Sequence, residues 1–172
     1  MTPNAVTLIG FLAMCGTGVV LAMGNLALGG ALIIAAGIFD ALDGSLARLT
    51  NRVTKFGAFL DSTTDRLAEG ALYFGILYWH LQRGMTCVAY LVFFTLFGSL
   101  MVSYTRARAE GIGIEMKEGL MTRFERIALL AIGLLLTAVF GDAPMLVVLG
   151  ILAVFTNITA LQRMWLVYRA TR

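Results

Sequence analysis

Charged residues are scarce in this chain of 172 residues. They make up 13% of the sequence, whereas a soluble domain carries roughly 25%. Between Thr2 and Phe39 there is no Asp, Glu, Lys, Arg or His at all. This uncharged run has room for nearly two membrane spans of about 20 residues each. Because it lacks a basic leading segment and continues into a second apolar segment, we do not expect it to be a secretory signal peptide.

Cysteine is equally rare, with two residues in the whole chain. Cys15 and Cys87 both lie in apolar stretches, and two such residues form neither a disulfide framework nor the spacing of a metal site. We therefore expect both thiols to be buried and chemically inactive.

What the chain has in excess is apolar surface, since 59% of its residues are hydrophobic. A soluble core of this length could not bury so much apolar surface, so much of it must face lipid. Breaks at Gly24-Asn25, at Gln82-Arg83-Gly84 and at Gly141-Asp142-Ala143-Pro144 help to divide the sequence into six apolar segments. The sequence predicts an all-α integral membrane protein with six transmembrane helices, at residues 5–23, 26–49, 56–81, 85–110, 120–140 and 143–169.

Basic residues are distributed unevenly between the two ends of these segments. The three turns named above contain one basic residue, Arg83, and the other twelve of the 13 lie at the opposite ends. This bias predicts a multi-pass protein of the cell membrane with both termini and the basic loops in the cytoplasm. The net charge of +3 and the isoelectric point near 9.1 do not indicate a nucleic-acid partner, because the basic residues form no continuous patch.

Four of the ten acidic residues fall inside predicted membrane helices. Asp40 and Asp43 are three residues apart, and Asp61 and Asp65 are four apart, so each pair shares one helix face. The short connection between the two helices makes them antiparallel neighbours, which brings the four carboxylates together. The carboxylates of such a cluster repel one another unless a cation joins them, and hard oxygen ligands suit Mg²⁺, Mn²⁺ or Ca²⁺ rather than zinc. We expect a polar, metal-containing cleft at the cytoplasmic end of the bundle.

Two other interpretations compete with a metal site. The acids could form buried ion pairs with Arg48, Arg52 and Arg66. They could also belong to a transporter or proton relay, which likewise places acids on membrane helices. Transporters commonly show repeats and broken helices near the midplane, and we find neither in the sequence. Intramembrane ionisable residues usually have a function, which favours the metal site.

The acids belong to a longer pattern of eight residues at fixed spacing over 26 positions. Asp40-Ala-Leu-Asp43-Gly44-Ser-Leu-Ala47-Arg48 is followed by Gly57, Asp61 and Asp65. The pattern resembles, at every fixed position, the signature of the CDP-alcohol phosphatidyltransferases. The resemblance implies one transmembrane domain over residues 1–172, a homodimer, and two Mg²⁺ or Mn²⁺ ions. The chain opens directly at Thr2-Pro3-Asn4, without the amphipathic helix that usually precedes the first span in this family.

Enzymes of the family displace CMP from a CDP-linked lipid with an alcohol as nucleophile. The resemblance implies that Asp40, Asp43, Asp61 and Asp65 hold the metals, and that Asp65 is also the general base that takes the hydroxyl proton. It further implies a group of residues that contact the CDP-linked lipid, namely Pro3, Asn4, Ala5, Val6, Gly44, Ala47, Arg48, Thr54 and Gly57.

The acceptor alcohol is predicted from three arginines. The segments around Arg106 and Arg126 resemble the phosphatidylinositol-phosphate synthase branch of the family, in which basic residues at these positions and at that of Arg163 hold the acceptor's phosphate. The resemblance therefore implies inositol phosphate as the acceptor, although that branch can carry Lys where this chain has Arg106. Glycerol phosphate would also suit a phosphate clamp, so a phosphatidylglycerophosphate synthase is the alternative within the family.

Overall fold

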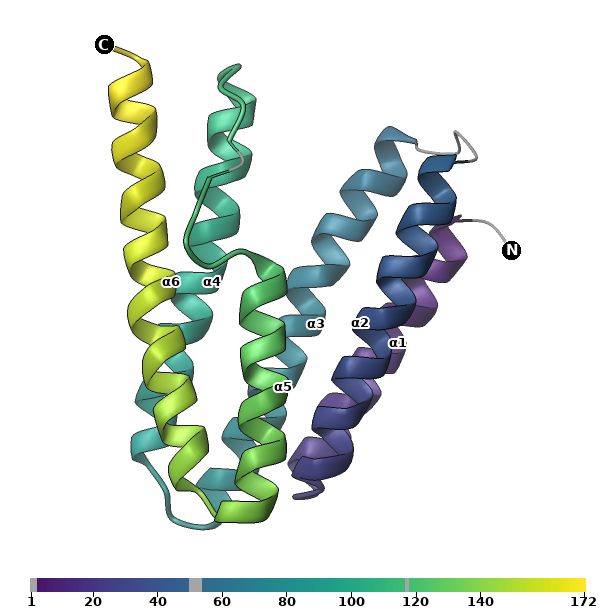
Figure 1. Cartoon of the computed structure of the whole chain (residues 1–172), viewed down its shortest axis with the longest axis vertical. Helices are drawn as coiled ribbons and strands as arrows, with labels where there is room; N and C mark the ends of the chain where they lie inside the picture. The colour runs from purple at the N-terminus through teal and green to yellow at the C-terminus, as the bar shows by residue number, and fades with distance from the viewer. Residues whose placement is uncertain (1–2, 50–53, 117) are drawn as a thin grey trace. The chain divides into compact units, whose positions relative to one another are not determined.

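The computed structural model describes residues 3–49, 54–116 and 118–172, excluding the side chains of residues 3 and 39–49. All regular secondary structure in this part of the chain is α-helical (Figure 1). The prediction of six helical segments is confirmed, with boundaries within three residues of those expected. The helices are α1 (Pro3–Ala22), α2 (Leu26–Leu49), α3 (Lys55–Gln82), α4 (Cys87–Gly111), α5 (Arg123–Phe140) and α6 (Ala143–Ala170).

The helices form two compact units, Met1–Arg83 with α1 to α3 and Gly84–Arg172 with α4 to α6. Glycine permits the turns within both units. Gly24, between α1 and α2, has φ of 85°, and Gly141, between α5 and α6, has φ of 80°. Side-chain-bearing residues rarely adopt these values, which explains why the sequence signals at both turns predicted the helix ends correctly.

In the first unit, α1 packs against both α2 and α3. The α1–α3 contact is a close approach of two backbones at glycines. A Cβ atom at Gly18 would lie 2.6 Å from the carbonyl oxygen of Ala71, and one at Gly75 would lie 2.1 Å from the carbonyl oxygen of Gly18. Small residues at such contacts let helices pack closely in lipid, where no hydrophobic effect drives them together.

We expect Gly75→Ala to destabilise this unit, because its methyl group would overlap the backbone of α1. Overpacking of this kind costs about 1–3 kcal/mol. Gly70→Ala is the matched control, since a Cβ atom there meets nothing within 4 Å on the same helix. Thermal unfolding of the detergent-solubilised protein should show a lower midpoint for Gly75→Ala than for Gly70→Ala. Equal midpoints for the two variants would contradict the close approach.

In the second unit, α6 packs against both α4 and α5. Polar side chains connect α4 to α6: the Thr95 hydroxyl donates to the Leu149 carbonyl at 3.2 Å, and the Asn157 amide donates to the Phe94 carbonyl at 3.0 Å. Where helices are surrounded by lipid, such hydrogen bonds contribute to helix association. They hold the charged ends of α4 and α6 in register beside each other.

Three helices of the described chain are long and apolar enough to cross a membrane, at Asn4–Ala22, Cys87–Gly111 and Ala143–Ala170. The described part of α2 contributes a shorter apolar stretch, Leu26–Ile38. Bulky apolar side chains are widely exposed, with Phe124 at 79% and Val139 at 73%. Long apolar helices and exposed apolar side chains are the properties of a membrane protein.

The expectation of buried thiols is wrong for Cys87, which is exposed at the start of α4, while Cys15 is half-buried. In a membrane protein, apolar residues lie at the lipid-facing surface as well as in the protein interior. Apolar sequence surroundings alone therefore could not predict burial of this side chain.

Candidate active site

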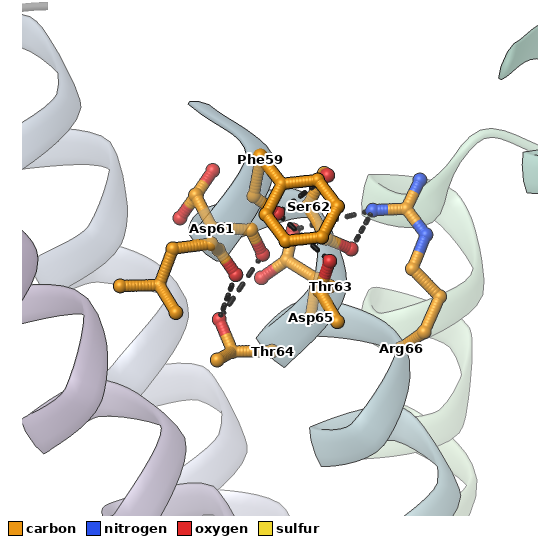
Figure 2. Close-up of polar contacts among 8 residues, drawn as sticks. Phe59, Asp61, Ser62, Thr63, Thr64, Asp65 and Arg66 are labelled. Carbon is orange, nitrogen blue, oxygen red and sulfur yellow. Dashed lines mark hydrogen bonds and ion pairs between the residues drawn. The ribbon is translucent and has the colours of Figure 1, made fainter. Parts of the chain in front are cut away.

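Two of the four expected metal ligands, Asp61 and Asp65, lie on successive turns near the start of α3 (Figure 2). Asp61 is exposed, and the side chain of Asp65 is 21% exposed. The hydroxyl groups beside them bond to their own helix: Thr63 donates to the Phe59 carbonyl at 2.8 Å and Thr64 to the Leu60 carbonyl at 2.9 Å. The carboxylates are therefore the strong cation-binding groups that this part of α3 presents.

Asp65 and Arg66 form an ion pair of the kind that the competing ion-pair interpretation expects. Asp65 Oδ2 lies 4.0 Å from Arg66 Nη1, while the same nitrogen donates to the Ser62 carbonyl at 2.5 Å (Figure 2). Adjacent helix residues do not face each other, and partly exposed pairs of this length contribute little stability. This contact does not explain why a carboxylate occupies this position.

The start of α3 brings together three of the residues expected to contact the CDP-linked lipid. Thr54 is the N-cap, and its hydroxyl oxygen accepts a 3.0 Å hydrogen bond from the Gly57 amide. A Cβ atom at Gly57 would lie 3.2 Å from the Asn4 side-chain oxygen on α1. A larger residue than glycine would press on both neighbours. The first turns of α1 and α3 thus meet one helical turn before Asp61.

The remaining expected residues of this unit are less fully described. Ala5 and Val6 are half-buried on the first turns of α1. Within the part of the chain that the structure describes, no three His, Cys, Asp or Glu side chains lie close enough together to hold a metal ion. The four-carboxylate cluster stays a prediction, because the side chains of Asp40 and Asp43 on α2 lie outside the described part. The same holds for the side chains of four residues expected to contact the lipid: Pro3, Gly44, Ala47 and Arg48.

The three arginines of the expected phosphate clamp come from three helices of the second unit. Arg106 on α4 is exposed, whereas Arg126 on α5 and Arg163 on α6 are 2% and 3% exposed. The positive charges of Arg106 and Arg126 both act on Arg163. Guanidinium groups from α4 and α5 therefore lie near Arg163 on α6, as do the carboxylates of Glu110 and Glu118. A bound anion would further offset the repulsion of Arg163 by the other two cations.

Backbone carbonyls orient the two buried arginines. Arg163 Nε donates to the Glu118 carbonyl at 2.8 Å and its Nη1 to the Val102 carbonyl at 2.6 Å. Arg126 Nη1 donates to the Met121 carbonyl at 3.3 Å. Arg106 Nε instead pairs with the Glu110 carboxylate at 2.8 Å. The connection between α4 and α5 therefore helps to fix the guanidinium groups.

Sequence reasoning missed the residues of this connection. Gly119 has φ of 153°, and a Cβ atom there would lie 3.0 Å from Arg163 Nη2. The Thr159 hydroxyl oxygen accepts a 3.2 Å hydrogen bond from the Met121 amide, which ties the connection to α6. Three glycines between two apolar segments, Gly111, Gly113 and Gly119, were the available signal, but they do not indicate which side chain needs the space.

A further acid on α3 was also missed. Glu69 lies one turn beyond Asp65 and is 3% exposed, so it extends the stripe of acids into the buried part of the helix. Spacing of four residues from Asp65 was visible in the sequence. Its burial was not, because burial depends on how α3 packs.

Comparison with known proteins agrees with the signature. The model of the CDP-alcohol phosphatidyltransferase family matches residues 1–166. The chain belongs to this family. The match includes α1 to α5 and most of α6, so it covers both the acids on α3 and the arginines of the second unit.

Relatives of this CDP-alcohol phosphatidyltransferase have named activities. The chain is 41% identical over 164 residues to the archaetidylinositol phosphate synthase of Methanothermobacter thermautotrophicus, covering 93% of this chain and 81% of that protein. It is also similar to the crystal structure of Mycobacterium tuberculosis phosphatidylinositol phosphate synthase with CDP-DAG bound. The TM-score is 0.89 at 33% identity, covering 98% of this chain and 87% of that one. The same enzyme with manganese and citrate gives a TM-score of 0.87 at 32% identity, covering 98% and 83%.

Proposed function

We propose that this CDP-alcohol phosphatidyltransferase transfers the lipid phosphate group of a CDP-linked lipid to the hydroxyl of an inositol phosphate and releases CMP. One observation carries the proposal: a complete family signature ends in Asp61 and Asp65 on α3. The charges of Arg106 and Arg126 acting on Arg163 support the choice of acceptor. Acids alone indicate the family chemistry. The arginines indicate an acceptor that carries a phosphate.

Divalent metal fits the donor set. Carboxylate oxygens on successive turns of α3 are hard ligands of the kind that Mg²⁺ and Mn²⁺ prefer. Asp61 and Asp65 would hold two such ions together with Asp40 and Asp43. When bound, the ions would supply charge stabilisation to the attacking and leaving oxygens of the phosphoryl transfer. The related synthase solved with manganese supports this assignment.

The donor lipid would bind at the start of α3. Asn4 and Thr54 present polar side chains there, and Gly57 leaves space beside the backbone. The positive end of a helix dipole favours phosphate groups. Ala5 and Val6 from α1 would contribute as well, together with residues of the signature and the start of α1, namely Pro3, Gly44, Ala47 and Arg48. The related synthase solved with CDP-DAG supports the choice of a CDP-linked lipid.

Asp65 would take the proton of the acceptor hydroxyl as its oxygen attacks the phosphorus atom next to the lipid. The bond from that phosphorus to the CMP oxygen then breaks, and CMP leaves with the electron pair. Asp65 suits this role because its side chain is only 21% exposed. Partial burial shields the proton transfer from bulk water while leaving access for a substrate.

The acceptor's phosphate would bind to Arg106, Arg126 and Arg163. A free phosphate is repelled by an acidic cleft unless cations hold it. Arg126 and Arg163 are buried and fixed by carbonyls, so they lose little freedom on binding. Guanidinium groups bind phosphate oxygens in pairs with good geometry. The relatives named as inositol phosphate synthases support inositol phosphate over glycerol phosphate.

The proposal includes the location of the enzyme. All six helices would cross the cell membrane as a single domain over residues 1–172, with the active site facing the cytoplasm and with a homodimer as the assembly. Water-soluble acceptor and CMP could then exchange with the cytoplasm, while the lipid tails stay in the bilayer. The charge bias of twelve basic residues against one supports this orientation.

The acceptor is tested by comparing inositol phosphate with glycerol phosphate, using CDP-diacylglycerol, Mn²⁺ or Mg²⁺ and CMP release as the readout. We expect inositol phosphate to be strongly preferred. In Arg126→Ala, the apparent KM for inositol phosphate should rise at least about tenfold, since a hydrogen bond between charged groups contributes about 1.5–3 kcal/mol. Preference for glycerol phosphate would overturn the acceptor assignment.

Two further variants separate the clamp from folding effects. Arg106→Ala removes an exposed member, so it tests the clamp even if loss of the buried Arg126 impairs folding. Arg108→Ala is the matched control, because Arg108 is two residues away on the same helix and therefore points in a different direction. Unchanged KM values in both Arg106→Ala and Arg126→Ala would reject the clamp while leaving the family reaction intact.

A further inference from the structure

A groove between α4 and α6 lies apart from the residues assigned so far. It has a volume of about 440 Å³ and opens near the C-terminal ends of both helices, with Arg108 and Tyr168 in its lining. We call it the α4–α6 groove. Its volume is within the roughly 300–1,000 Å³ typical of small-molecule sites. Arg106 is two residues from Arg108 and is absent from this lining, so the groove is not part of the phosphate clamp.

One end of the α4–α6 groove is apolar. Met101 and Met164 line it, and both side chains can adjust their shape to a flexible hydrocarbon. Thr105 also lines it, but its hydroxyl donates to the Met101 carbonyl at 2.8 Å, so its hydrogen-bonding capacity is used within α4. Met164 is 54% exposed, which leaves this end of the groove open at the surface of two helices long enough to cross a membrane.

Toward the C-terminal ends of both helices the lining combines one cation, Arg108, with the apolar residues Ala109, Ile112 and Val167. Arg108 lies seven residues beyond Met101, about 10 Å along the helix axis. The Arg172 guanidinium carbon lies 4.7 Å from the centroid of the Tyr168 ring, which also lines the groove. Tyr104 and Tyr168 are more than half exposed beside these cations. Tyrosine and arginine in this arrangement are typical of the membrane–water interface.

We propose that the α4–α6 groove is a binding site for one anionic glycerophospholipid, distinct from the catalytic site. An acyl chain would lie along Met101 and Met164, and the lipid phosphate would contact Arg108, with Arg172 adding positive charge. The apolar lining suits an acyl chain, and Arg108, with Arg172 near Tyr168, suits an anionic headgroup. This inference goes beyond the proposed reaction and does not depend on it.

Charge also argues against a second copy of the chain as the occupant. A two-fold interface would place the same surface on both partners. Such an interface through the groove would bury Arg108 and Arg172 of both copies together, with no acid in the groove lining to offset their charge. An anionic lipid instead neutralises them, and cytoplasmic leaflets attract basic residues next to membrane spans through such lipids.

The test is a titration of the full detergent-purified protein with dioleoylphosphatidylglycerol and with dioleoylphosphatidylcholine, followed by native mass spectrometry. We expect the anionic lipid to bind more tightly. Arg108→Gln should weaken its binding about tenfold, the effect of losing one charge-assisted hydrogen bond, with little change for phosphatidylcholine. Met164→Trp should weaken both lipids by filling the groove.

The matched control is Arg169→Gln. Arg169 is on the same end of α6, but its guanidinium lies over Trp165, at 5.6 Å from the ring centroid, and it does not line the groove. Equal weakening by Arg169→Gln and Arg108→Gln would overturn the proposal in favour of diffuse attraction to basic residues. Loss of a dimer in Met164→Trp with unchanged lipid binding would overturn it in favour of a second copy. CMP release, measured in parallel, tests the catalytic proposal separately.

Discussion

Asp65→Asn should lower turnover by about 10²–10⁴-fold, the usual effect of removing a general base, while nucleotide binding persists. An amide cannot accept the hydroxyl proton, but it keeps the shape of the side chain and can still offer an oxygen to a cation. The side chain is 21% exposed on α3, so the substitution leaves no large cavity. CMP release gives the turnover, and isothermal titration with CMP in the presence of Mn²⁺ gives the binding.

Ser62→Ala is the control for this prediction. Ser62 lies on the same turn of α3, and its hydroxyl donates to the Phe59 carbonyl at 2.9 Å, so its loss removes a polar group without touching a carboxylate. Turnover of Ser62→Ala should stay close to that of the unmodified enzyme. If Asp65→Asn also turned over normally, another group would have to be the base.

The helices could be predicted almost completely from the sequence because their ends carry local signals. Gly24 and Gly141 stop one helix before the next, and both have the positive φ that glycine permits. Predominantly apolar stretches between such breaks then specify the segments. Local chemistry decides these boundaries, so no knowledge of the tertiary structure was needed.

The close contact of α1 with α3 could not be predicted. Gly18 and Gly75 are 57 positions apart, and neither differs in its local sequence from the many other glycines of the chain. Gly70, on the same helix, meets nothing within 4 Å. Which glycine lies at a contact depends on how the helices cross, which local sequence does not specify.

Some residues of the candidate site could be predicted from the sequence itself, others only through the family resemblance, and their backbone contacts not at all. The acids were found because charge is costly in a membrane segment and their spacing matches a known signature. The three arginines were found only through resemblance to one branch of the family. The carbonyls that orient Arg163 come from Val102 and Glu118, which are 61 and 45 residues away in the sequence. Every residue has a backbone carbonyl, so the residue type does not indicate which carbonyls bind Arg163.

The largest effect is expected from loss of metal binding. Turnover should depend on divalent metal. Asp61→Ala should abolish most of the turnover, because a cluster of carboxylates that loses one ligand holds its cations more weakly. Asp43→Ala should behave in the same way, since the signature gives both residues the same role. Asp61 is exposed at the start of α3, so the helix should still fold without its carboxylate.

Metal binding should be measured directly as well as through activity. Manganese electron paramagnetic resonance on the purified protein should show bound Mn²⁺ that Asp61→Ala and Asp43→Ala reduce. Asp142→Asn is the control, because Asp142 precedes α6 in the second unit and is no part of the signature. Near-normal CMP release from chelator-treated enzyme would refute the metal assignment. Reduced Mn²⁺ binding with normal turnover would show that these carboxylates bind a cation that the reaction does not use.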